Sequence, residues 1–259
     1  MIDAHQHFWR LGANDCSWPT EAEAAIHRDF LPEDWAAVAL PCGVTGSVLV
    51  QSQESARDTA WLLDLAERHD FILGVVGWAD LTATDFPRSP WLKGLRPMVQ
   101  DYAADMLDDP ALDPGLRAMA RQGLVFDALV RPRHLPALER MAIRHPNLQI
   151  VIDHMAKPEI AADGNMMAWQ HKMDDLAELP NVACKLSGLL NEVGDMPYDW
   201  AIEWVADVYA PDRLIWGSDW PVLNLAGDYA EWLEIAKAAI PETAHAAVFN
   251  DNARRIYKL

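Results

Sequence analysis

The chain begins Met1-Ile2-Asp3-Ala4-His5-Gln6-His7-Phe8-Trp9, so that Asp3, His5 and His7 occupy alternate positions. In an extended strand successive side chains point to opposite faces, and this spacing therefore sends one carboxylate and two imidazoles in the same direction. Two imidazoles on one face can ligate a metal, polarise a carbonyl group or share a proton. The alternative is a polar strand end that faces solvent. We interpret the stretch as a first β-strand with a candidate functional site at its end.

Short apolar or β-branched runs recur through the rest of the chain, and a stretch with helical periodicity follows most of them. The eight predicted strands cover residues 2–7, 46–51, 71–78, 94–97, 123–130, 148–154, 181–187 and 213–219. The helical patterns include residues 56–69, 136–145, 169–178, 200–208 and 229–239, with a closing helix over 244–257. Such alternation is typical of parallel strands that are joined by crossover helices.

Eight strand–helix units in 259 residues match a (β/α)8 barrel of the TIM type. The alternative, a doubly wound open sheet, is weaker because no Gly-rich phosphate loop follows an early strand. Polar residues also occur at the ends of many strands rather than at one switch point. No repeat or linker divides the sequence, so we expect residues 1–259 to form a single α/β domain.

The charge balance excludes some classes of partner. There are 39 acidic against 21 basic residues, a formal net charge of -18, which disfavours nucleic acid and anionic membrane surfaces. Cys16, Cys42 and Cys184 are widely spaced and predict neither a disulfide framework nor a cysteine zinc site. The first strand leaves no room for a signal peptide, and no apolar run reaches membrane-spanning length. We expect a cytoplasmic protein, and its oligomeric state is left open.

In a barrel of this type the residues at the carboxyl ends of the strands line the active site. His154 ends the sixth predicted strand and Asp219 the eighth, while Arg96 lies on the fourth. Taken singly, His154 could be a buried structural histidine and Asp219 a helix N-cap. Their occurrence at corresponding strand ends, together with His5 and His7, favours a shared site.

Several segments carry a family resemblance. IDAHQHFW (residues 2–9), GLRPM (94–98), VIDHMAKP (151–158), KLSGL (185–189) and IWGSDWPV (215–222) resemble the amidohydrolase superfamily, and within it the sugar-lactone and dicarboxylate-lactone hydrolases. The resemblance implies a distorted (β/α)8 barrel in which four side chains face one pocket. These are His5, His7, His154 and Asp219.

The fifth strand departs from the pattern of many superfamily members, which place a metal-ligating histidine there. Asp127 is the only strongly polar side chain in residues 123–130. His5, His7 and Asp219 could only just supply the three protein ligands of a catalytic metal, with His154 as a possible fourth. Some lactonases of the group work without a metal. The sequence therefore predicts either no required cofactor or one divalent cation, zinc being the first candidate.

The resemblance implies hydrolysis of a lactone. Asp219 would act as general base for an attacking water, and the three histidines or a metal would stabilise the oxyanion. No GxSxG elbow or reactive cysteine motif indicates a covalent nucleophile. Because Arg96 is the one arginine clearly on a strand end, a neutral sugar lactone such as L-fucono-, L-rhamnono- or galactonolactone is favoured over a dicarboxylate.

Further side chains are predicted to bind the substrate. Trp9 and Trp220, two of 12 tryptophans, would pack against the C–H faces of a sugar, and Arg96, Gln51 and Lys157 would form hydrogen bonds with it. Three alternatives stay open. They are a metal-dependent decarboxylase of the same superfamily, a pyrone- or muconolactone-type dicarboxylate lactonase, and a non-catalytic barrel that binds sugar acids.

Overall fold

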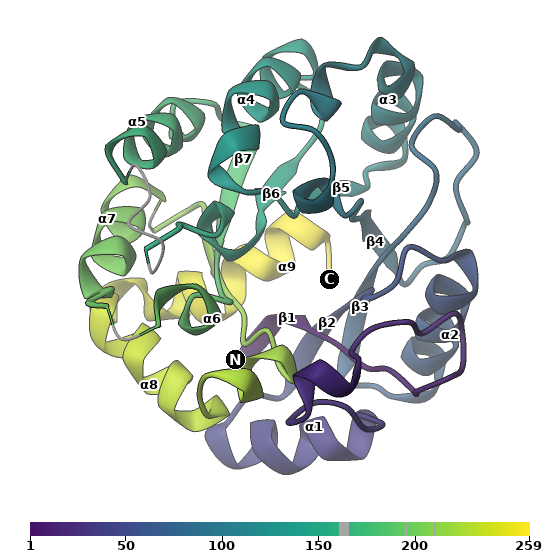
Figure 1. Cartoon of the computed structure of the whole chain (residues 1–259), viewed down its shortest axis with the longest axis vertical. Helices are drawn as coiled ribbons and strands as arrows, with labels where there is room; N and C mark the ends of the chain where they lie inside the picture. The colour runs from purple at the N-terminus through teal and green to yellow at the C-terminus, as the bar shows by residue number, and fades with distance from the viewer. Residues whose placement is uncertain (161–165, 195, 210) are drawn as a thin grey trace.

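The computed structural model describes residues 1–160, 166–194, 196–209 and 211–259. Its strands form one parallel sheet in the order of the chain, β1-β2-β3-β4-β5-β6-β7-β8, with helices around the outside (Figure 1). The strands are β1 (Ile2–Gln6), β2 (Gly46–Val50), β3 (Ile72–Gly77), β4 (Leu92–Leu95), β5 (Val125–Ala128), β6 (Ile150–Ile152), β7 (Val182–Leu186) and β8 (Leu214–Trp216). The predicted α/β barrel is confirmed.

The sheet closes into a barrel at the carboxyl ends of its first and last strands. Gln6 and Trp220 form a parallel bridge, and the backbone N–H of His7 donates to the Trp220 carbonyl at 2.8 Å. The N–H of Asp219 donates to the His5 carbonyl, also at 2.8 Å. The seam between β1 and β8 is therefore held by the residues that carry the candidate site.

The helices cover the outside of the barrel. They are α1 (Pro32–Ala39), α2 (Ala56–Arg68), α3 (Asp113–Gln122), α4 (Leu135–Arg144), α5 (Met166–Ala177), α6 (Leu190–Val193), α7 (Asp199–Tyr209), α8 (Tyr229–Ala239) and α9 (Asn252–Tyr257). Apolar faces such as Leu62, Leu65 and Ala66 of α2 pack into one large core between the helices and the strands. No helix of the described residues is long and apolar enough to cross a membrane.

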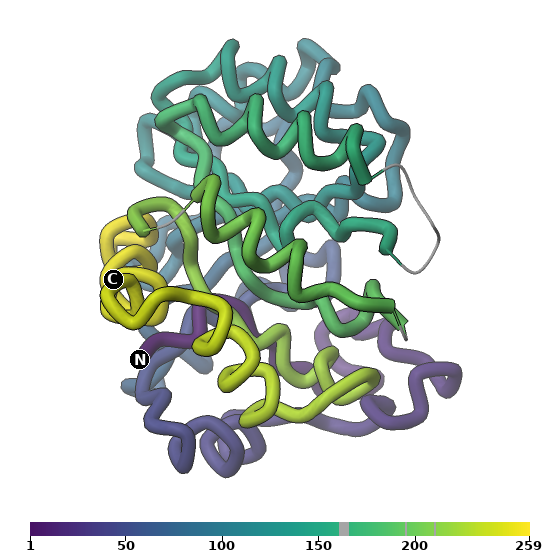
Figure 2. Tube along the Cα trace, turned by 90° about the vertical axis from the view of Figure 1, so that its left-hand side faces the viewer, coloured from purple at the N-terminus to yellow at the C-terminus, as the bar shows by residue number. Residues whose placement is uncertain are grey.

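The last helix crosses the amino-terminal mouth of the barrel. In Figure 1, α9 lies across the centre of the ring of strands, and in Figure 2 the two chain ends lie on the same side of the molecule. Ala253, Ile256 and Tyr257 join a cluster with small and β-branched residues from inside the barrel, such as Val50 and Val151. This end of the barrel is therefore covered by apolar packing.

Candidate active site

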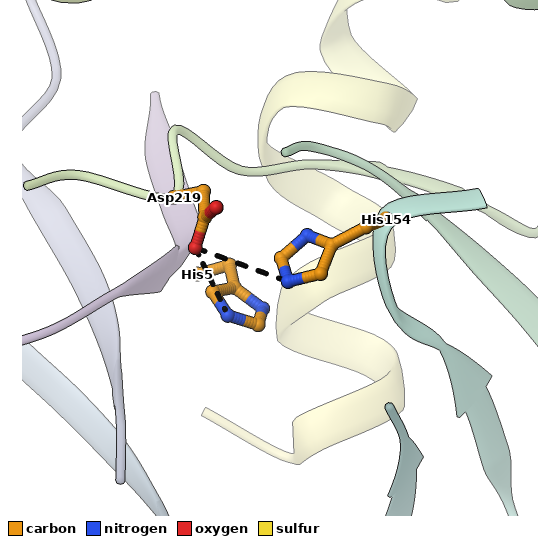
Figure 3. A group of neighbouring side chains, drawn as sticks. All are labelled: His5, His154 and Asp219. Carbon is orange, nitrogen blue, oxygen red and sulfur yellow. Dashed lines mark ion pairs between the residues drawn. The ribbon is translucent and has the colours of Figure 1, made fainter. Parts of the chain in front are cut away.

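Three imidazoles converge on one carboxylate at the carboxyl end of the barrel. The Nε2 atoms of His7, His5 and His154 lie 3.2, 3.7 and 3.8 Å from Asp219 Oδ1. Figure 3 shows His5 and His154 directed toward Asp219 from separate strand ends. The four residues that the sequence analysis grouped by motif are thus neighbours in space, although β1 and β8 are at opposite ends of the chain.

The backbone around this cluster is unusual. His154 has a φ of 52° and Asp219 a φ of 61°, in the left-handed region that non-glycine residues seldom adopt. Such conformations cost about 1–3 kcal/mol each and persist where the surroundings hold them in place. Two glycines make room: a Cβ at Gly188 would lie 2.5 Å from His154 Nδ1, and one at Gly217 would lie 2.7 Å from His5 Cβ.

Hydrogen bonds on the far side of each ring orient the imidazoles. His7 Nδ1 donates to the Val50 carbonyl at 2.8 Å, because a carbonyl can only accept, and its Nε2 forms a hydrogen bond with Asp219 Oδ1 at 3.2 Å. His154 Nδ1 bonds to Ser187 Oγ at 2.9 Å. A hydroxyl can donate to this nitrogen, which leaves Nε2–H of His154 free to point toward a ligand.

A buried charge network lies beneath His5. Lys185 Nζ is 3.2 Å from His5 Nδ1, 3.0 Å from Asp153 Oδ1 and 2.5 Å from Asp127 Oδ2. The hydroxyl of Tyr257 donates to Asp127 at 2.9 Å. All of these side chains are buried. Sequence reasoning noted Lys185 and Asp127 without a role and missed Asp153, whose only signal was its place at a strand end directly before His154.

Burial and charge set the protonation states. Burial lowers the pKa of His154 to about 4 and holds the pKa of His5 well below its ordinary value. Burial on its own would raise the pKa of Asp219, but His154, His7 and His5 outweigh it and lower that pKa. Near neutral pH the cluster therefore contains an ionised carboxylate beside neutral His5 and His154.

A cavity of about 500 Å³ opens above the cluster. Of the predicted site residues, His7, Arg96, His154, Lys157 and Asp219 line it. The loops after several strands complete its wall with mostly polar side chains, among them Ser52, Gln53, Glu54, Gln100 and Asp101.

Three predicted substrate-binding residues lie elsewhere. Trp9 and Trp220 are only 1% and 2% exposed, and both rings pack edge-to-face against Phe30 in the core. The backbone N–H and carbonyl groups of Trp9 and Phe30 also hydrogen bond to one another, which keeps Trp9 beside Phe30. Gln51 is fully buried and donates to the Arg96 carbonyl at 2.7 Å. The aromatic ring on the cavity wall belongs to Trp18 instead.

The cluster has the donor set of a metal site. One ligand atom each from His5, His154 and Asp219 lie within 4.8 Å of one another, and two imidazoles with a carboxylate suit zinc. The Nε2 of His7 stands beside them, 3.2 Å from Asp219. Of the predicted ligands, His5, Asp219 and the possible fourth, His154, form the group that fits a divalent cation, whereas His7 lies outside that group. Arg96 Nη1 approaches His5 Nε2 at 3.4 Å.

The comparisons with known proteins agree with this geometry. The amidohydrolase family model matches residues 2–259. An L-fucono-1,5-lactonase of Burkholderia ambifaria is 47% identical over 100% of this chain and 95% of that protein. An L-fucono-1,5-lactonase of Burkholderia multivorans is 32% identical over 100% and 96%. A crystal structure of an amidohydrolase from Burkholderia multivorans with bound zinc has a TM-score of 0.93, is 32% identical and covers 100% of this chain and 99% of its own.

Proposed function

Because this chain belongs to the amidohydrolase family, we propose that it hydrolyses the ring ester of a sugar lactone. The observation that carries the proposal is the Asp219 carboxylate, which faces the cavity among three imidazoles and is ionised near neutral pH. The full-length likeness to two L-fucono-1,5-lactonases supports the same reaction. An aldonolactone of a hexose or deoxyhexose is the proposed substrate class, with L-fuconolactone first among them.

Asp219 is the proposed general base. A water held between Asp219 and the lactone carbonyl would lose a proton to the carboxylate as its oxygen attacks the carbonyl carbon. His7, whose Nε2 forms a hydrogen bond with the same carboxylate oxygen at 3.2 Å, would hold Asp219 in the orientation that this proton transfer needs. Asp219 would then return its proton to the ring oxygen as the C–O bond breaks, which gives the open hydroxy acid without a covalent intermediate.

The developing oxyanion needs positive or hydrogen-bonding groups. His154, through Nε2–H, and the guanidinium of Arg96 both line the cavity and are proposed for this task. A divalent cation, when bound, would be held by His5, His154 and Asp219 and would polarise the carbonyl as a Lewis acid. We propose that turnover does not require it, since the Arg96 guanidinium lines the cavity and already lies 3.4 Å from His5 Nε2.

The cavity lining supports a neutral, hydroxyl-rich ligand. Its two cationic side chains, Arg96 and Lys157, are balanced on the wall by Glu54 and Asp101, and Lys157 Nζ lies 3.5 Å from Glu192. A dicarboxylate would need several unpaired cations that converge on it. The proposed roles of the other lining groups are hydrogen bonds with the sugar hydroxyls.

The test is a pH-indicator assay with a stereochemically diverse set of aldonolactones, run with and without a chelator. We expect one proton released per lactone opened, at the same rate after metal removal. Loss of all activity on chelation, with decarboxylation of an aromatic acid by the zinc-loaded protein, would identify the decarboxylase instead. Lactone binding without ring opening would identify a non-catalytic barrel.

A further inference from the structure

Asp3 carries a buried carboxyl group that the proposed mechanism does not use. The residue is fully buried, and five hydrogen bonds reach its two carboxyl oxygens. The donors are the N–H groups of His5 and Ser218 at 3.2 and 2.9 Å, the hydroxyls of Ser218 and Tyr229 at 2.6 and 3.0 Å, and the indole N–H of Trp35 at 3.2 Å. Such bonds compensate for the hydration that a buried acid loses.

The carboxyl group of Asp3 points away from the cavity. Its partners Trp35 and Tyr229 belong to α1 and α8, which lie outside the barrel. The alternation in the sequence predicted that Asp3 faces the same way as His5 and His7. This is wrong for Asp3, because the pairing of β1 with β2 shifts register after this residue. Any effect of Asp3 on the site must therefore pass through another residue.

Ser218 links Asp3 to the proposed general base, Asp219. The N–H and the hydroxyl of Ser218 donate to the two Asp3 oxygens, and the Ser218 hydroxyl oxygen accepts from the Trp220 N–H at 2.9 Å. The residues on either side of Asp219 are thereby joined to each other and to β1. Asp219 itself has a φ of 61°, and its N–H donates to the His5 carbonyl. A backbone in this region persists only where its surroundings hold it.

We propose that Asp3, through Ser218, is a positioning residue for Asp219. We call the two hydrogen bonds from Ser218 to Asp3 the clamp. The clamp holds the turn in the conformation that keeps Asp219 Oδ1 3.2 Å from His7 Nε2, and without it the turn relaxes and withdraws the carboxylate from the imidazoles. The inference rests on the proposed lactone hydrolysis and adds to it a buried acid that acts on the general base from the outer side of the barrel wall.

The test compares Ser218→Ala with Tyr229→Phe. Each variant removes one hydroxyl that donates to Asp3 Oδ2, at 2.6 and 3.0 Å, and neither position is more than 2% exposed. We expect a similar fall in Tm in both variants. In Ser218→Ala, kcat for lactone opening should fall about 10- to 100-fold with KM within about twofold, since a misplaced carboxylate is a poor base.

Tyr229→Phe is the matched control, because it leaves both bonds of the clamp intact. Its kcat should stay within about twofold of wild type. Equal losses of kcat in the two variants would overturn the proposal, and so would a wild-type kcat in Ser218→Ala.

A double variant separates positioning from a general loss of structure. Because the clamp acts through Asp219, adding Ser218→Ala to Asp219→Asn should lower the remaining kcat by less than about twofold, with uncatalysed lactone opening subtracted. A loss as large as the one in the wild-type background would show that Ser218 acts independently of Asp219, which would overturn the proposal.

Crystal structures of the two variants give a measurement that needs no lactone. In Ser218→Ala, Asp219 Oδ1 should lie beyond hydrogen-bond distance of His7 Nε2, more than about 3.5 Å away, whereas Tyr229→Phe should retain the 3.2 Å contact. An unchanged contact in Ser218→Ala would overturn the positioning role. Absence of lactonase activity in the wild type would instead refute the proposed function.

Should Ser218→Ala not fold, Ser218→Cys takes its place in all three measurements. A thiol is a weaker donor than a hydroxyl, so kcat should again fall without a change in KM, and the same outcomes decide.

Discussion

The two mouths of the barrel are built in opposite ways. At the amino-terminal mouth, Ile256 and Tyr257 of α9 pack against β-branched side chains from inside the barrel. At the carboxyl-terminal mouth, buried imidazoles, carboxylates and cations surround an open pocket, and His154 and Asp219 adopt left-handed backbone conformations. The comparison shows a division of roles. Apolar packing at one end stabilises the fold, and the other end holds the buried charged groups and the strained backbone conformations of the candidate site.

The largest expected effect is at the carboxyl-terminal mouth. Asp219→Asn should lower kcat for lactone opening by about 10²- to 10⁴-fold, because an amide cannot accept the proton of the attacking water. The circular dichroism spectrum and Tm should stay close to those of wild type. The surface variant Asp64→Asn serves as control. Turnover within tenfold of wild type would remove Asp219 from the mechanism.

The charge network between the two mouths gives the next effect. Lys185→Met should reduce the free energy of unfolding by about 3–5 kcal/mol, because Asp127 and Asp153 would be left buried without their shared cation. Urea unfolding at pH 7 measures this. Lys172→Met, which removes a half-buried surface pairing with Glu139, should cost less than about 1 kcal/mol. Equal losses in the two variants would contradict the assigned role of the buried network.

Apolar packing at the amino-terminal mouth can be tested separately. Ile256→Ala should reduce the free energy of unfolding by about 2–4 kcal/mol through the cavity that it leaves, while kcat and KM remain near wild type. Ile143→Ala, at a position 58% exposed, is the matched control and should change stability by less than about 0.5 kcal/mol. A fall in kcat for Ile256→Ala below that of the control would show that the two mouths are coupled.

The smallest effect is a dependence of stability on pH. Burial lowers the pKa of His154 from 6.5 to about 4. Between these two pH values His154 is therefore protonated in the unfolded chain but neutral in the folded protein. Stability from this source is present above pH 6.5 and is lost as pH falls toward 4, by up to roughly 3 kcal/mol. His154→Gln should flatten the fall in Tm between pH 6.5 and pH 4.5. An unchanged slope would mean that His154 is protonated in the folded protein.

Periodicity and topology account for what could be predicted from the sequence. All eight strands were located, and Tyr229–Ala239 was predicted with its observed bounds. The predicted strands are mostly too long, since residues such as His154 and Asp219 leave the ladder to enter the pocket. The helices α1, α3 and α6 were not singled out. Strand-end residues converge in any barrel, which is why His5, His154 and Asp219 could be grouped.

Other parts of the site depend on contacts that no periodic pattern encodes. Trp18 reaches the cavity from an irregular loop, whereas Trp9, nearer to the histidines in sequence, turns into the core. The pairing of Lys185 with Asp153 joins the seventh strand to the end of the neighbouring sixth strand. Both features follow from where side chains point in three dimensions, and local sequence does not fix that.

The seam between β1 and β8 also has a consequence for biosynthesis. His7 and Asp219, which bond across it, are separated by 212 residues. During translation, His5 and His7 therefore leave the ribosome well before their carboxylate partner Asp219, which follows only after β2 to β8 have emerged. The reactive centre is completed by the same event that closes the barrel, so no truncated translation product that lacks the eighth strand contains it.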